Sequence, residues 1–211
     1  MNSRKAIKMI IKEIAEKIKH KIEMRKYDDF SIEDYFRKNG ASVGSGNRIM
    51  IRSLGEAPEL VRIGNHCTIT SDVAFITHDG GGWVFNDEIP DLQKFGTIVV
   101  NDNTFIGFRS IILPNTVIGP NAVIGSGSVV TKNVEPNTVV GGNPARRICS
   151  IEEYKEKITN IWKFQKPEGY LKNIKPGTAP RDIEFMKRVE LKRLYAHLHM
   201  CLWNRDKKER A

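Results

Sequence analysis

The side chains in this 211-residue sequence best suited to reaction chemistry are its histidines and cysteines. A neutral imidazole accepts a proton near neutral pH or binds a metal, and a thiolate is a nucleophile. The three cysteines have no paired spacing and predict neither a disulfide framework nor a zinc site. They are Cys67, Cys149 and Cys201, and the five histidines are His20, His66, His78, His197 and His199.

A period of six residues in the middle of the chain indicates which elements position these side chains. A small or β-branched residue follows each aliphatic residue of the period by four positions, and no helix or alternating strand has this spacing. A chain that turns a corner every six residues gives a parallel β-helix of hexapeptide repeats, with glycine or asparagine at positive φ. A β-sandwich with fortuitous spacing is the alternative. The aliphatic residues are Val100, Ile106, Ile112, Ile118, Ile124 and Val130, with earlier members at Ile63, Ile69 and Phe75 and a weaker pair at Val43 and Ile49.

The period breaks between Ile76 and Thr97, where the sequence reads ITHDGGGWVFNDEIPDLQKFG. Three consecutive glycines followed by Trp83 and Phe85 cannot continue the coil. We therefore expect a loop, residues 76–97, that leaves the β-helix at one corner. His78 stands at the root of this loop, and loops on a rigid scaffold commonly carry function.

Both ends of the chain read as helices and hold the basic charge. Residues 1–26 have nine basic and three acidic side chains with isoleucines at helical spacing, and residues 181–211 have nine and five. The formal charge of +9 thus leaves the middle near neutral, without the basic patch of a nucleic-acid enzyme. Capping boxes are expected at Ser31–Asp34 and at Ser150–Glu153, and Gly40 ends the first short helix.

We therefore expect a mainly β protein in three parts. Residues 1–40 form an N-terminal helical extension, residues 41–149 the β-helix, and residues 150–211 C-terminal helices, the last from Arg181 to about Trp203. The N-terminal sequence is interrupted by charge too often for a signal peptide or a membrane span. A cytoplasmic protein is the expectation.

The run TIVVNDNTFIGFRSIILPNTVIGPNAVIGSGSVVTKNVEPNTVVGGNPARRI closely resembles the hexapeptide-repeat acetyltransferases of the maltose and galactoside O-acetyltransferase type. The resemblance covers about residues 40–165. It implies a left-handed β-helix, a homotrimer, and acetyl-CoA bound in clefts between neighbouring subunits. It also implies acetyl transfer to a hydroxyl of a sugar or glycan.

The resemblance implies site residues as well. Thr77-His78 matches the family position of the general base, although Asp79 stands where the family usually has proline. A composite site would place Lys132 and Arg147 against His78 of a neighbouring chain. Phe105 matches an aromatic position that flanks the site. The residue types of the loop, and not the resemblance, suggest that a sugar stacks on Trp83 and bonds to Asp79; the alternative is that the loop packs its aromatic side chains against a neighbouring subunit. The expected CoA-binding residues are Arg109, Ser126, Thr131, Lys132 and Arg147.

Other functions remain open at this stage. N-acetylation of an amino sugar would use the same machinery, and a scaffold subunit would keep the coil without catalysis. A γ-class carbonic anhydrase shares the fold but needs three converging imidazoles, whereas only His66 and His78 lie in the coil, so no metal is expected. Cys67 occupies a small-residue corner, which disfavours a nucleophilic role. The basic N-terminal helix would contact a membrane surface or, as we favour, pack on the β-helix or a partner subunit.

Overall fold

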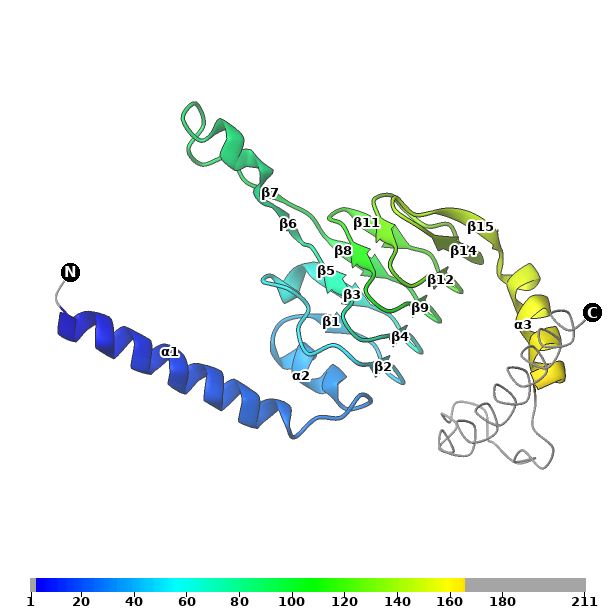
Figure 1. Ribbon diagram of the computed structural model, residues 1–211, viewed down its shortest axis with the longest axis horizontal. Coiled ribbons are helices and arrows are strands. Elements are labelled where there is room, and N and C mark those ends of the chain that lie inside the picture. The colour runs from blue at the N-terminus through cyan, green and yellow to red at the C-terminus, as the bar shows by residue number, and fades with distance from the viewer. Residues whose placement is uncertain (1–2, 166–211) are drawn as a thin grey trace, which may run out of the picture. The chain divides into compact units, whose positions relative to one another are not determined.

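The computed structural model describes residues 3–165 and shows short parallel strands stacked as successive coils (Figure 1). The strands form three sheets, which the chain visits in the order A, B, C within each coil. Sheet A contains β1 (Ser42–Val43), β3 (Val61–Ile63), β8 (Ile98–Val100) and β11 (Thr116–Ile118). Sheet B contains β2 (Arg48–Ile49), β4 (Thr68–Ile69), β9 (Phe105–Ile106), β12 (Val123–Ile124), β14 (Thr138–Gly141) and the antiparallel β15 (Arg146–Ser150). Sheet C contains β5 (Ala74–Phe75), β10 (Ile111–Ile112) and β13 (Val129–Val130).

The strand register confirms the period of six. Val100 pairs with Ile118 and Ile112 with Val130, so residues 18 positions apart stack directly on one another in this part of the chain. All six aliphatic residues of the main run are buried in one core, and so are the small residues that follow them. Three sheets per 18-residue coil give a triangular prism with three corners, which we name A–B, B–C and C–A by the sheets that they join.

The A–B corner shows how the coils are held in register. His66, Asn103, Asn121 and Asn137 all have φ near +55° and stack in this order. Asn103 Nδ2 donates to Asn121 Oδ1 at 2.7 Å, and Asn121 Nδ2 donates to Asn137 Oδ1 at 2.9 Å. Asparagine tolerates the left-handed region, and its amide both donates and accepts, so one residue type turns the chain and joins adjacent coils.

Asparagine supplies positive φ values at the corners, as expected, and glycine supplies them at Gly46 and Gly127. Positive φ falls on the third residue after five of the six aliphatic residues of the main run, where even Arg109 adopts it (φ +57°), but not after Val130. The glycines directly after the aliphatic residues are needed for space. A Cβ on Gly107 would lie 2.5 Å from the backbone N of Ser126, and one on Gly119 would lie 2.5 Å from that of Pro136.

The coil is interrupted at the predicted loop, whose ends form a hairpin that the sequence did not predict. Strands β6 (His78–Asp79) and β7 (Lys94–Phe95) pair antiparallel, with His78 opposite Phe95, and Gly96 N donates to Thr77 O. A 3₁₀ helix, η2 (Gly80–Phe85), follows β6, and the arm projects from the coil (Figure 1). Asn65 and Asp102 lie on adjacent coils, and Asn65 N donates to Asp102 Oδ1. They are 37 positions apart in the sequence instead of 18, because the hairpin is inserted between them. The shorter η1 (Pro58–Leu60) enlarges the preceding coil.

Three α-helices flank the coils in sequence: α1 (Ser3–Met24), α2 (Ile32–Lys38) and α3 (Ile151–Gln165). No described helix is long and apolar enough to cross a membrane. The box at Ser150–Glu153 is confirmed, because each residue's side chain accepts the other's backbone N–H. Gly40 follows α2 at φ +94°, as expected. The helix predicted from Arg181 lies outside the described residues.

One expectation about the N-terminal segment is wrong, and another is narrowed. Ser31 makes no side-chain cap on α2; its hydroxyl instead donates to Asp28 Oδ1, which also accepts the Ser31 backbone N–H. The isoleucine stripe of α1 does not pack on the β-helix of its own chain, because Ile11, Ile14, Ile18 and Ile22 are all more than half exposed. Of the alternatives stated above, a partner subunit and a membrane surface are left.

Because the Gly119 position faces backbone, Gly119→Ala should destabilise the coil by roughly 1–3 kcal/mol, the usual cost of forcing a methyl group into a packed interior. Gly80→Ala is the matched control, since nothing lies within 4 Å of its added Cβ. Thermal unfolding followed by circular dichroism measures the difference. Equal melting temperatures for the two variants would contradict the close approach of coils at Gly119.

Cys67 should react slowly with alkylating reagents. It is buried, its thiol lies 3.2 Å from Asn101 O, and burial raises the pKa of the thiol. A raised pKa leaves less thiolate at any given pH, so at pH 8 native Cys67 should be alkylated at least about tenfold more slowly than the less buried Cys149. Peptide mapping after timed alkylation measures both rates, and similar rates in the native protein would refute the buried placement.

Candidate active site

The C–A corner carries the candidate base and two of the expected CoA-binding residues. His78 follows β5 at this corner, and Thr131 and Lys132 follow β13, two coils further along sheet C. The intervening positions stack: Gly96 lies against Asn115, and Val117 N donates to Asn133 Oδ1 at 2.9 Å. At about 4.8 Å per coil, His78 and Lys132 are separated by about 10 Å along the corner. They therefore share one corner of one chain.

His78 is accessible for reaction. Its side chain is 39% exposed, and its ring lies 6.3 Å from that of Phe95 across the hairpin stem. Nε2 lies 3.6 Å from a carboxylate oxygen of Glu56, too far for a hydrogen bond. Immediately before it, the buried Thr77 has a hydroxyl with no hydrogen-bond partner among the described residues. The imidazole is thus anchored by the backbone of the stem and faces solvent.

The hairpin residues expected to bind substrate have separate environments. Asp79 Oδ1 accepts the Gly81 N–H at 2.9 Å, and Oδ2 pairs with Lys94 Nζ at 3.3 Å. These contacts, the Gly81 N–H first, hold the pKa of Asp79 below its ordinary value. Its carboxylate therefore stabilises the start of η2. Trp83 lies on η2 and is 77% exposed, without contact to His78.

A pocket of about 360 Å³ lies at the C-terminal end of the coils. Its wall brings together Thr131, Lys132 and Arg147, as expected, and adds Arg146 and Glu135. Arg146 was not among the residues expected at the site, although its position beside Arg147 was a signal. Three cations around one pocket suit a phosphate-bearing ligand, since guanidinium and ammonium groups are the usual protein partners of phosphate.

The other expected residues lie on a different part of the prism. Arg109 and Ser126 stand at the B–C corner, where Gly127 N donates to Phe108 O. Arg109 Nε lies 3.5 Å from Asp72 Oδ2, and its guanidinium lies 4.9 Å from the centre of the Phe108 ring. Phe105 is on sheet B, 40% exposed. Within one chain, none of these three residues shares the corner of His78.

The two coil histidines are also separated. His66 Nδ1 lies 2.9 Å from Asn103 Oδ1 at the A–B corner, away from His78. In the part of the chain that the structure describes, no three histidine, cysteine, aspartate or glutamate residues are grouped as metal ligands would be. His197 and His199 lie outside the described residues.

Comparisons with known proteins identify the fold family. Residues 97–132 match the family model described as bacterial transferase hexapeptide (six repeats). Protein CapG of Staphylococcus aureus is 48% identical over 141 residues, which are 65% of this chain and 82% of CapG. A chloramphenicol acetyltransferase of Agrobacterium fabrum is 36% identical over 110 residues, 44% of this chain and 53% of that protein. WbbJ of Escherichia coli, named as a lipopolysaccharide biosynthesis O-acetyl transferase, is 30% identical over 112 residues, 49% of this chain and 55% of WbbJ.

The chain spans most of CapG but only about half the length of the other two relatives. The family match covers the six-residue period itself, and the CapG match extends well beyond it. The family resemblance read from the sequence is confirmed. The chain belongs to the hexapeptide-repeat acetyltransferases, acyltransferases with a left-handed β-helix and acetyl-CoA as the acyl donor.

Proposed function

We propose that this protein transfers an acetyl group from acetyl-CoA to a hydroxyl of a sugar or glycan, with His78 as the general base. The observation that carries this proposal is a solvent-accessible histidine at the root of the hairpin, on the same corner as a basic pocket two coils away. The name of WbbJ, an O-acetyl transferase of lipopolysaccharide biosynthesis, supports a sugar hydroxyl as the acceptor.

The chemistry needs few groups. His78 removes the proton of the acceptor hydroxyl while the hydroxyl oxygen attacks the thioester carbonyl carbon. A C–O bond forms, and the carbonyl oxygen becomes the oxyanion of a tetrahedral intermediate. A backbone N–H aimed at that oxygen would stabilise it. The intermediate then collapses, the C–S bond breaks, and the CoA sulfur takes the proton from the imidazolium. Atoms and charges balance without a covalent enzyme intermediate.

The basic pocket would orient the acyl donor, acetyl-CoA. Lys132, Arg146 and Arg147 would hold the phosphates of CoA at the C-terminal end of the coils. The pantetheine arm would then run along the C–A corner toward His78, with backbone groups of the corner as partners for its amides. The separation of about 10 Å leaves room for an extended arm between the two groups of residues.

A second chain would complete the site. The C–A corner of one chain is open, and Arg109, Ser126 and Phe105 lie on other surfaces of the prism. A homotrimer would bring the B–C corner and sheet B of one chain against the C–A corner of the next. The exposed apolar side chains of Phe105, Phe108 and Val117 support such burial. We place this enzyme in the cytoplasm, where acetyl-CoA is available.

The proposal is tested first at His78. His78→Ala should lower kcat by about 10²–10⁴-fold and leave acetyl-CoA affinity nearly unchanged, because a general base acts mainly in the transition state. CoA release is measured with a panel of sugars, amino sugars and nucleotide sugars, which also separates O- from N-acetylation. Near-normal turnover in a folded His78→Ala variant would remove this residue from the mechanism.

The second test concerns the donor. Lys132→Ala or Arg147→Ala should raise KM for acetyl-CoA about tenfold or more, and the effect should shrink with added salt, since exposed phosphate contacts are screened. Dephospho-CoA thioesters should show a smaller penalty. Glu56→Gln is the control, because it lies near His78 but outside the basic pocket. Equal penalties for both thioesters would place these cations away from the 3′-phosphate.

A further inference from the structure

Helix α1 has an apolar face that nothing in the described chain covers. Ile11, Ile14, Ile18 and Ile22 follow one another at spacings of three and four, and their exposed fractions are between 52% and 61%. Isoleucine side chains left in water forgo the free energy of burial, so a continuous row of them indicates a surface that binds something.

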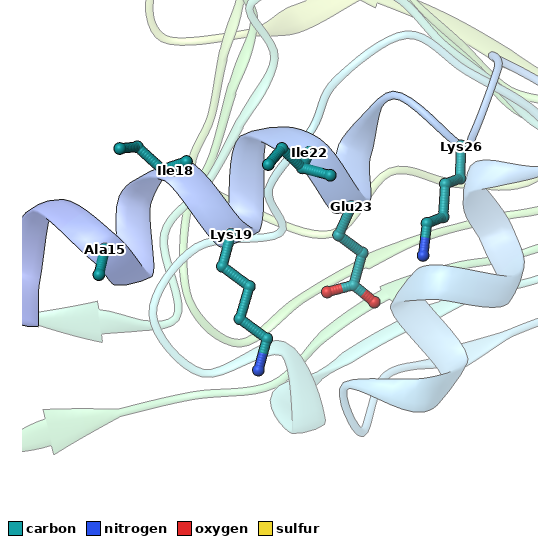
Figure 2. A pocket seen from close by; sticks show the side chains of 6 residues that line it. All are labelled: Ala15, Ile18, Lys19, Ile22, Glu23 and Lys26. Carbon is teal, nitrogen blue, oxygen red and sulfur yellow. The ribbon is translucent and has the colours of Figure 1, made fainter.

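The positive charge of the same helix indicates that its partner is anionic. Residues 1–26 hold nine basic and three acidic side chains, whereas residues 27–180 are close to neutral. Lys19 and Lys26 border a shallow groove with Ile18 and Ile22, and Lys21 follows Ile18 by three positions on the same side of the helix. Figure 2 shows Lys19 and Glu23 extending away from Ile18. The isoleucine row is thus flanked by Lys21, and the groove beside it holds Lys19 and Lys26 together with the acidic Glu23.

We propose that α1 lies along the surface of an anionic lipid bilayer, with its isoleucines at the boundary of the acyl chains and its lysines among the headgroup phosphates. Lysine stems can lie beside apolar groups while the ammonium reaches the phosphates. No described helix can span a membrane, so the orientation is parallel to the surface. Anionic lipid attracts each basic side chain that comes near it.

A second copy of α1 fits this face less well. Each copy would bring the same excess of positive charge, nine basic against three acidic side chains in residues 1–26, and burying such an excess in a self-contact is costly. Glu16 lies away from the row, in its pair with Lys12 at 3.9 Å, whereas Glu23 lines the groove beside Ile18 and Ile22. Self-association would therefore bury cations together, whereas an anionic bilayer neutralises them.

The test is flotation of the full chain with vesicles of phosphatidylcholine alone or with about one third phosphatidylglycerol. The wild-type chain should float only with the anionic vesicles, and less at high salt. Ile14→Gln/Ile18→Gln should lower the partition coefficient at least about tenfold, because two apolar groups are lost while glutamine keeps the helix propensity. Lys19→Glu/Lys21→Glu should lower it by a similar factor.

Glu16→Gln is the matched control, since it places the same side chain on the polar face and should bind at least as well as wild type. Circular dichroism checks that each variant is folded, and sedimentation without lipid gives the oligomeric state. No flotation of the wild type, or flotation unaffected by the glutamine pair, would overturn the proposal. A glutamine pair that changes the oligomeric state without lipid would also overturn it and assign this face to a second copy.

Discussion

One inward aliphatic side chain in every six residues is the constraint on which this structure depends. Each such residue closes one side of a triangular coil, and the next coil must bury its own residue directly above it. The contacts between stacked aliphatic side chains therefore form the core and also set the register of each coil on the next. The asparagine ladder of the A–B corner and the close approach at Gly107 and Gly119 both follow from this stacking.

The same constraint decides where function can be placed. A corner position repeats every 18 residues in the regular part of the coil, so residues that share a corner form a row along the prism. Loops leave the coil only at the corners in the described chain, since the backbone of the flat sides is paired between strands. The hairpin with His78 and the basic residues after β13 occupy one such row. Arg109 and Ser126 occupy another.

The sequence was sufficient to predict the repeating part of the fold, because the six-residue period follows directly from the burial of one aliphatic side chain on each side of every coil. It predicted the buried residues, the position of the inserted loop and the capping box at Ser150. It was less informative where a local hydrogen bond determines the helix cap. At Ser31 the hydroxyl donates to Asp28 and does not cap α2. It also could not assign His78 and Lys132 to a corner, because the inserted hairpin hides how far the register shifts between them. The register of β5, β10 and β13 supplies that relation.

The central claim is that the corner of His78 works together with the B–C corner of another chain. Mixing His78→Ala chains with Ser126→Tyr chains, after dissociation and reassembly, tests it directly, because the tyrosine would fill the exposed B–C edge. If each site combines the two corners from neighbouring chains, randomly mixed trimers should regain about a quarter of wild-type activity, since both intact edges meet at one interface in four. Each variant alone should be nearly inactive. Verified mixed trimers that remain inactive would show that the two corners do not form a shared site.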